Sequence, residues 1–233
     1  MNKKLAFVLI IVVLSIAVIA PGQFTKKAGA PETLQIALTF DDGPSEHTSQ
    51  ILDVLQKYNA KATFCVLGKE LEGREDIILA AANAGHQIIG HSWEHKQLKF
   101  ATEEYIREDI RKTNETIENI IGTAPKFFRT PYGEFSPKIR RAMEEAGLVQ
   151  VQWNVDTLDW KSQNSNSIYN MIMNNAENGA ILLSHDIFAA TAAAIEIAIP
   201  ALINKGYELV TVEELLGETT AGRVYRSKGV EIK

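Results

Sequence analysis

The sequence has a single cysteine, Cys65, in 233 residues, so no disulfide can form within the chain. Because Cys65 lies in the apolar run ATFCVLG, we expect it to be a small buried side chain and not a nucleophile. The chain also lacks a concentrated stripe of lysine and arginine, and its formal net charge is -5. No nucleic acid is therefore expected as a partner, and an uncharged substrate fits more easily.

The sequence also lacks a long-period repeat, and no G-x-G-x-x-G pattern follows the first strand-like run. The second absence argues against a dinucleotide-binding domain. With 45% hydrophobic and 23% charged residues, the composition is that of a globular protein that can bury one large core. We expect a single main domain and a monomer.

The first 20 residues are predicted to be a signal peptide or a membrane anchor. Two lysines precede an apolar run from Leu5 to Ala20, which is long for a secretory signal and slightly short for a spanning helix. The small-x-small sites ending at Ala20 and Ala30 are each followed by proline, which favours an uncleaved hydrophobic helix. The remainder would then be exported to the outer face of a bacterial membrane, after a linker over residues 21–32.

Apolar runs of strand length alternate with amphipathic stretches of helix length over residues 33–217. This alternation favours a parallel α/β sheet with crossover helices, either open or curved into a barrel. Gly122 is predicted to end the longest helix, and Thr211 with Glu214 has the pattern of a capping box. Residues 218–233 are expected to be a weakly structured C-terminal tail. The seven predicted strands are 34–40, 62–67, 86–90, 126–129, 148–153, 180–184 and 207–210.

Five polar clusters each follow one of these strands. They are TFDDGP, HSWEH, RTPYG, DTLDW and LLSHD. Asp-Gly-Pro alone is ordinary turn chemistry, and an isolated pair of histidines is a weak signal for a metal. However, the carboxyl ends of parallel strands meet at one rim, so all five clusters are expected to lie together. Their coincidence favours a functional site over five unrelated turns.

The histidine pair and the aspartate pair suit a metal-dependent hydrolysis. His91 and His95 are four residues apart, a spacing that puts two imidazoles on one side of a helical turn. A carboxylate on the same rim would complete three ligands and leave positions open for water. Asp41 and Asp42 are consecutive, so their side chains point in different directions, and one can ligate the metal while the other acts as a base.

In this order and on this frame, the five motifs resemble those of the NodB-like polysaccharide deacetylases, carbohydrate esterase family four, over about residues 34–216. The resemblance implies an α/β fold, an irregular and incomplete (β/α)7 barrel. It also implies metal-dependent removal of acetyl groups from an N- or O-acetylated sugar polymer. One departure is Ile89-Gly90 before the first histidine, where the family commonly has Gly-Asn.

The resemblance assigns the metal and the base. Asp42, His91 and His95 would hold a divalent cation. Zinc is the first choice, and cobalt, nickel or iron would also suit this ligand set. Asp41 would be the general base, and Arg129 would hold it ionised and oriented through a charge-assisted pair.

The resemblance also assigns the acid and the walls of the pocket. His185, polarised by Asp159, would protonate the departing amine. The backbone N–H of Tyr132 would stabilise the oxyanion. Trp160 and Leu183 would wall the acetyl pocket.

A purely structural role stays open for some of these residues. Arg129 would also suit a surface ion pair, Trp160 a core aromatic and His185 a helix start. Asp156 either takes part in the site or only supports its loop.

An exported chain tethered at the outer face of a bacterial membrane lies beside peptidoglycan. We therefore expect N-acetylglucosamine in peptidoglycan or chitooligosaccharide as the substrate, with acetylxylan as an alternative. A non-catalytic wall protein that binds glycan through Trp93, Tyr132 and Trp160 is an alternative of a different class. A glycosidase with two carboxylates would leave the histidine pair without a role.

Overall fold

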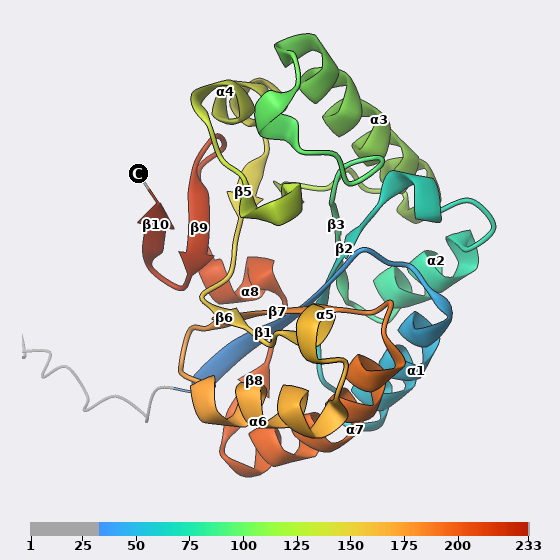
Figure 1. The fold of residues 1–233 in the computed structure, drawn as a ribbon, viewed down its shortest axis with the longest axis vertical. Helices are drawn as coiled ribbons and strands as arrows, with labels where there is room; N and C mark the ends of the chain where they lie inside the picture. The colour runs from blue at the N-terminus through green and yellow to red at the C-terminus, as the bar shows by residue number, and fades with distance from the viewer. Residues whose placement is uncertain (1–32, 233) are drawn as a thin grey trace, which may run out of the picture. The chain divides into compact units, whose positions relative to one another are not determined.

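Figure 1 shows the fold in a computed structural model, which describes residues 33–232. The N-terminal helix and the linker expected over residues 1–32 lie outside the described residues. Within residues 33–232, none of the helices combines the length and the apolar character needed to cross a bilayer.

The described strands form one sheet of ten strands, in the order β10-β9-β5-β4-β3-β2-β1-β7-β6, with β8 paired to β1 outside this path. All pairings between these strands are parallel except that of β9 with β10. The strands are β1 (Leu34–Asp41), β2 (Thr63–Val66), β3 (Gln87–Gly90), β4 (Phe127–Phe128), β5 (Val149–Val151), β6 (Val155–Asp156), β7 (Ile181–His185), β8 (Tyr207–Leu209), β9 (Val224–Ser227) and β10 (Val230–Ile232).

Helices connect the successive parallel strands, as the alternating pattern predicts, except β5 and β6, which residues 152–154 join without a helix. They are α1 (Glu46–Lys57), α2 (Glu75–Asn83), α3 (Glu103–Ile121), α4 (Pro137–Glu145), α5 (Asp159–Ser162), α6 (Ser165–Asn175), α7 (Ala189–Asn204) and α8 (Val212–Leu216), with short 3₁₀ helices η1 (Gly68–Glu70), η2 (Leu98–Phe100) and η3 (Pro131–Gly133). Gly122 ends α3 in the left-handed conformation, and Thr211 with Glu214 forms the capping box of α8. These two predictions are confirmed.

The sheet is buried on both faces around β1, which explains why this strand is apolar without interruption. Ile36, Leu38 and Phe40 point into one hydrophobic cluster, against α1, α2, α6 and α7. Ala37 points to the other face, which α8 and β9 cover. Each of the seven predicted strands overlaps an observed one. β6 and β10 lie at the two ends of the strand order and do not pair with each other, so the sheet is open. The prediction of an irregular, incomplete barrel is confirmed.

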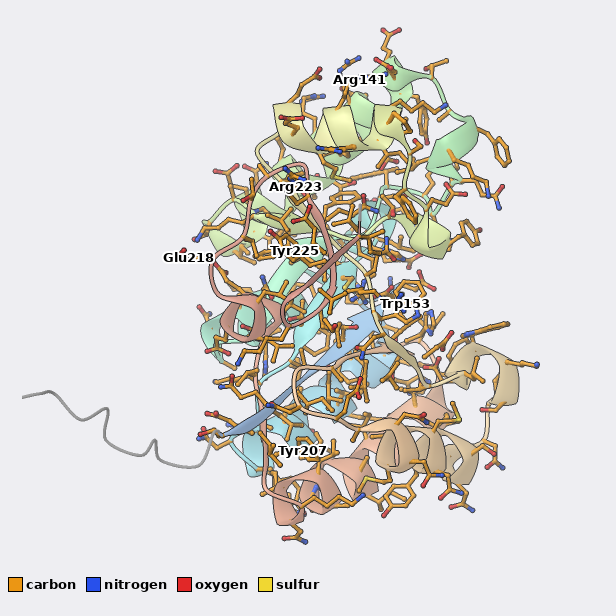
Figure 2. The ribbon with its side chains drawn as sticks, turned by 90° about the vertical axis from the view of Figure 1, so that its left-hand side faces the viewer. Arg141, Trp153, Tyr207, Glu218, Arg223 and Tyr225 are labelled. Atoms are coloured by element: carbon orange, nitrogen blue, oxygen red, sulfur yellow. The ribbon has the colours of Figure 1, made fainter. Side chains whose placement is uncertain are left out.

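The expectation of a weakly structured tail over residues 218–233 is wrong, because residues 224–232 form the β9–β10 hairpin. β9 pairs with the open edge of β5, and the backbone N–H of Gln152 donates to the carbonyl of Tyr225 at 2.7 Å. Val224 is buried, and Tyr225 packs against the cluster on that face of the sheet. Figure 2 views the molecule from the side of this hairpin and labels Arg223 and Tyr225. The hairpin protects a strand edge that would otherwise be exposed.

Deleting residues 223–233 should therefore lower the free energy of unfolding by about 3 kcal/mol, because burying one valine contributes roughly 1.5–3 kcal/mol and the edge of β5 is also uncovered. Urea unfolding of the purified proteins measures the change. A shorter deletion of residues 228–233 removes only the outer strand, whose residues Val230 and Glu231 are exposed, and should cost less. Equal unfolding midpoints for the intact chain and the longer deletion would contradict this account of the hairpin.

Candidate active site

The polar clusters converge at the carboxyl ends of the parallel strands, as the alternating pattern predicts. Asp41 ends β1 and lies in register with Cys65 of β2 on one side and with His185 of β7 on the other. All the predicted site residues except Arg129 and Asp159 line one cavity of about 420 Å³. The lining residues are Asp41, Asp42, His91, His95, Tyr132, Trp153, Asp156, Trp160, Leu183 and His185.

Asp42, His91 and His95 form a cluster that fits a divalent metal ion. Asp42 Oδ1 lies 3.5 Å from His91 Nε2 and 3.4 Å from His95 Nε2, and one ligand atom from each residue lies within 4.8 Å of the others. Asp42 Oδ1 is buried and has no hydrogen-bond partner among the described residues. A buried carboxylate oxygen without a partner is costly, and a cation between the three residues would satisfy it.

The second nitrogen of His91 fixes the orientation of its ring. Nδ1 lies 2.8 Å from the carbonyl oxygen of Arg129, which can only accept, so Nδ1 carries the proton and donates. In the neutral ring Nε2 is then the nitrogen without a proton, and it faces Asp42, where it could ligate a metal ion. This is the arrangement in which an outer hydrogen bond sets the tautomer of a metal-binding histidine.

The expectation that His91 and His95 share a helical turn is wrong, because β3 ends at Gly90 and residues 91–96 form a loop. Ser92 and His95 both have a positive φ, 71° and 62°, and the backbone N–H of His95 donates to Ser92 Oγ at 2.9 Å. Gly90 departs from the family pattern, and a Cβ there would come within 2.7 Å of the Phe128 ring. A larger residue at position 90 would therefore force the side chains of Phe128 and Asn114 to move.

Asp41 is buried and paired with Arg129. Arg129 is fully buried, at 0% exposure, which excludes the alternative of a surface ion pair. Its Nη1 donates to Asp41 Oδ1 and to Thr39 Oγ1, both at 2.7 Å, and its Nη2 donates to the carbonyl of Gln152 at 3.1 Å. Burial alone would raise the pKa of Asp41, but nearby positive charges, with the Arg129 guanidinium first among them, outweigh burial and lower that pKa. Asp41 is thus ionised although it is buried.

His185 lies across the cavity and is paired with Asp159. His185 Nδ1 donates to Asp159 Oδ1 at 2.8 Å, and its backbone N–H donates to Oδ2 at 2.6 Å. Thr191 Oγ1 also donates to Oδ2, at 2.7 Å, so the fully buried carboxylate is held firmly. Burial would lower the pKa of His185, but Asp159, with Asp41 and Asp42, raises it to about 9. The imidazole is therefore protonated at neutral pH.

The remaining predicted residues form the walls of the cavity. Tyr132 is 59% exposed, has a φ of 59°, and its ring meets the His95 ring at a centroid distance of 4.5 Å. Trp160 is 51% exposed, so it is not a core aromatic. Leu183 is buried in the middle of β7 and lines the cavity.

Two further residues line the cavity, and the motif analysis did not assign them a role. Trp153, labelled in Figure 2, follows β5 and packs with its ring 5.5 Å from the Arg129 guanidinium. The only sequence signal for Trp153 was an aromatic residue at the end of the predicted strand over residues 148–153. Asp156 lines the cavity and also supports its loop, because its Oδ1 accepts from the backbone N–H of Leu158 at 2.8 Å. Asp156 therefore supports its loop and is also placed at the cavity wall.

Comparison with known proteins identifies the family. The sequence profile of the family described as polysaccharide deacetylase matches residues 28–151. The chain is 40% identical over 185 residues to the peptidoglycan-N-acetylglucosamine deacetylase PgdA of Listeria monocytogenes, covering 79% of this chain but only 39% of that protein. It is 37% identical over 193 residues to a peptidoglycan-N-acetylglucosamine deacetylase of Bacillus cereus, covering 81% of this chain and 70% of that protein.

A solved structure gives the same result in three dimensions. The family 4 acetyl xylan esterase of Clostridium thermocellum, determined with a cobalt ion, superimposes with a TM-score of 0.78 at 36% sequence identity, covering 84% of this chain and all of that one. Sequence profile, relatives and fold agree, and the chain belongs to the polysaccharide deacetylase family, as its five motifs imply.

Proposed function

We propose that this chain is a metal-dependent deacetylase that hydrolyses acetyl groups from N-acetylated sugar residues of a polysaccharide. One observation carries the proposal. A single cavity holds three side chains that could ligate a metal ion, an ionised buried carboxylate and a protonated histidine. Hydrolysis of an amide needs a base for the attacking water and an acid for the departing amine, and the two groups supply these functions.

Asp42, His91 and His95 would hold the metal ion, with zinc as the first choice and cobalt, nickel or iron as alternatives. When bound, such an ion polarises the acetyl carbonyl and makes a water molecule more acidic. Asp41 Oδ1 is occupied by Arg129, whereas Oδ2 lies 3.6 Å from His91 Nε2, toward the metal ligands. Oδ2 is therefore the atom that takes the proton from the attacking water.

His185 would act as the general acid. Its Nδ1 proton is committed to Asp159, so Nε2 carries the proton that reaches the leaving nitrogen. The backbone N–H of Tyr132 would stabilise the oxyanion, and Trp160 and Leu183 would enclose the acetyl methyl group. Reaction is thus favoured when Asp41 has lost its proton and His185 has kept one.

N-acetylglucosamine in peptidoglycan is the substrate that we favour, because two relatives carry that substrate in their names. The exposed rings of Tyr132 and Trp160 suit contact with sugar rings at the rim of the cavity. Chitooligosaccharide offers the same acetamido group, and the acetyl xylan esterase makes acetylxylan an alternative. Action on peptidoglycan would require export, with residues 1–20 as signal peptide or membrane anchor.

A panel of acetylated glycans tests the proposal directly. We expect the purified protein to release acetate from peptidoglycan and chitooligosaccharide, to lose this activity with a chelator, and to regain it with zinc or cobalt. Acetate release that survives complete metal removal would refute the metal-dependent mechanism. Binding to glycan without acetate release from any substrate, peptidoglycan and acetylxylan included, would support the non-catalytic alternative.

Substitution of the two neighbouring aspartates separates their roles. Asp41→Asn should still bind zinc but lose acetate release by roughly 10²–10⁴-fold, because an amide cannot accept the proton. Asp42→Asn is the matched control, and it should lose zinc affinity because it removes a ligand. Zinc binding by calorimetry and acetate release measure the two effects. Turnover of Asp41→Asn at the level of the unmodified chain would exclude Asp41 as the base.

The pH profile tests the acid. His185 must be protonated to act, so kcat/KM should fall as pH rises through its pKa of about 9. In Asp159→Asn, His185 stays buried but loses the negative charge that stabilises its protonated form. The pKa of His185 therefore falls, and the alkaline limb of the kcat/KM profile moves to lower pH. Asp156→Asn removes a charge from the same cavity without contact to His185, and should move the limb far less. An alkaline limb that stays in place in Asp159→Asn would exclude the pairing of His185 with Asp159 as its cause.

A further inference from the structure

Asp109, a buried acidic residue of α3, lies outside the cavity but contacts the loop that carries the two histidines. Its exposure is 4%, and it does not line the active-site cavity. Asp109 Oδ2 accepts a hydrogen bond from the backbone N–H of Trp93 at 3.1 Å. Trp93 is the middle residue between His91 and His95. The carboxylate therefore holds the centre of the segment that links the two proposed metal ligands.

The loop needs such support because its backbone is strained. Ser92 and His95 occupy the left-handed region, which disfavours residues other than glycine. Residues in such conformations persist only where surrounding contacts determine them. On the side of η1, the backbone N–H of Gly68 donates to the carbonyl of Ser92 at 3.0 Å, and that of Lys69 donates to the carbonyl of Trp93 at 3.1 Å. Both backbone polar groups of Trp93 are thus engaged, one by η1 and one by Asp109.

The Trp93 side chain is held as tightly as its backbone. A Cβ at Gly68 would come within 2.2 Å of the indole, so η1 packs directly against the ring. On α3, the Lys112 ammonium lies 3.5 Å from the ring centroid, a cation–π contact. α3 therefore supports the loop through two residues, Asp109 and Lys112.

An aspartate is energetically unfavourable at this buried position. Its Oδ1 is buried without a hydrogen-bond partner, and burial raises its pKa to about 6. The side chain makes no ion pair among the described residues. Among the described residues, its side chain makes one hydrogen bond, which it accepts from the Trp93 amide in the loop over residues 91–95. A hydrophobic residue would fill the same space without the penalty, so the hydrogen bond to the loop is the feature that calls for an acceptor here.

We propose that Asp109 is a positioning residue for metal binding: by accepting the Trp93 amide, it holds the strained 91–95 loop so that His91 and His95 face Asp42 before the ion arrives. The inference rests on the metal-ligand roles proposed above. Hydrogen-bond partners of metal-ligating side chains typically change metal affinity by 10–100-fold when they are removed. Asp109 itself touches neither the ion's ligands nor the cavity, so its effect passes through Trp93.

Two substitutions at Asp109 and one control test this role. Asp109→Ala removes the acceptor, and we expect zinc affinity to fall by about 10–100-fold, with a changed absorption spectrum of the cobalt-loaded protein. Asp109→Asn keeps an acceptor oxygen and should restore zinc affinity to within about threefold of the unmodified chain. Thr113→Val is the control, because Thr113 is equally buried on α3 but bonds only to the carbonyl of Asp109. It should leave zinc affinity and the cobalt spectrum unchanged.

A measurement on the unmodified protein does not depend on whether a variant folds. Amide hydrogen exchange of the metal-free protein should show the Trp93 amide strongly protected, since the loop is formed in advance. A Trp93 amide that exchanges freely until zinc is added would overturn the proposal. So would an Asp109→Ala protein with unchanged zinc affinity and cobalt spectrum, or an Asp109→Asn protein as weak as Asp109→Ala. If the unmodified chain itself binds no zinc, the metal-ligand roles fail first, which distinguishes that result from a failure of Asp109 alone.

Discussion

The buried ion pair of Arg129 with Asp41 is the interaction on which the rest of the site depends. Arg129 is the largest fully buried side chain in the described part of the chain, and its guanidinium reaches Asp41 and Thr39 on β1 and the carbonyl of Gln152 after β5. Its own carbonyl accepts from His91 after β3. Arg129 directly follows β4, so this one residue links β1, β3, β4 and β5 near their carboxyl ends. Removing one partner of a buried pair would leave an uncompensated charge, which typically costs about 3–5 kcal/mol.

Strain in the ligand loops is a second constraint. Asp42 has a φ of 74°, and such a residue costs about 1–3 kcal/mol unless its surroundings determine it. Behind this loop lies Asp186, whose Oδ2 accepts from Thr48 Oγ1 and whose carbonyl accepts from Ser45 Oγ, both at 2.5 Å. Asp186 Oδ1 is buried without a partner, and burial raises its pKa to about 7. Buried carboxyl groups with one unpartnered oxygen therefore lie behind both loops that carry the proposed ligands, Asp186 behind one and Asp109 behind the other.

The positions of the clusters could be predicted from sequence, because the ends of parallel strands must share a rim whatever the loops do. The loop conformations could not. The spacing of His91 and His95 suggested a helical turn, but the positive φ of Ser92 and His95 depends on contacts with η1 and α3, which are distant in sequence. Trp153 and the C-terminal hairpin were missed for a related reason. Short segments carry little periodicity, and the β9–β10 hairpin exists because the edge of β5 is available to it.

The acid and the base depend on each other as well as on their own partners. The negative charge of Asp41 helps to raise the pKa of His185, and the positive charge of His185 helps to lower the pKa of Asp41. Each group is also fixed by a buried partner of opposite charge, Arg129 for the carboxylate and Asp159 for the imidazole. Environments that separate the pKa values of two groups in one cavity assign one as base and the other as acid. Because the two shifts reinforce each other, neutralising either group moves the other toward the protonation state in which it cannot act.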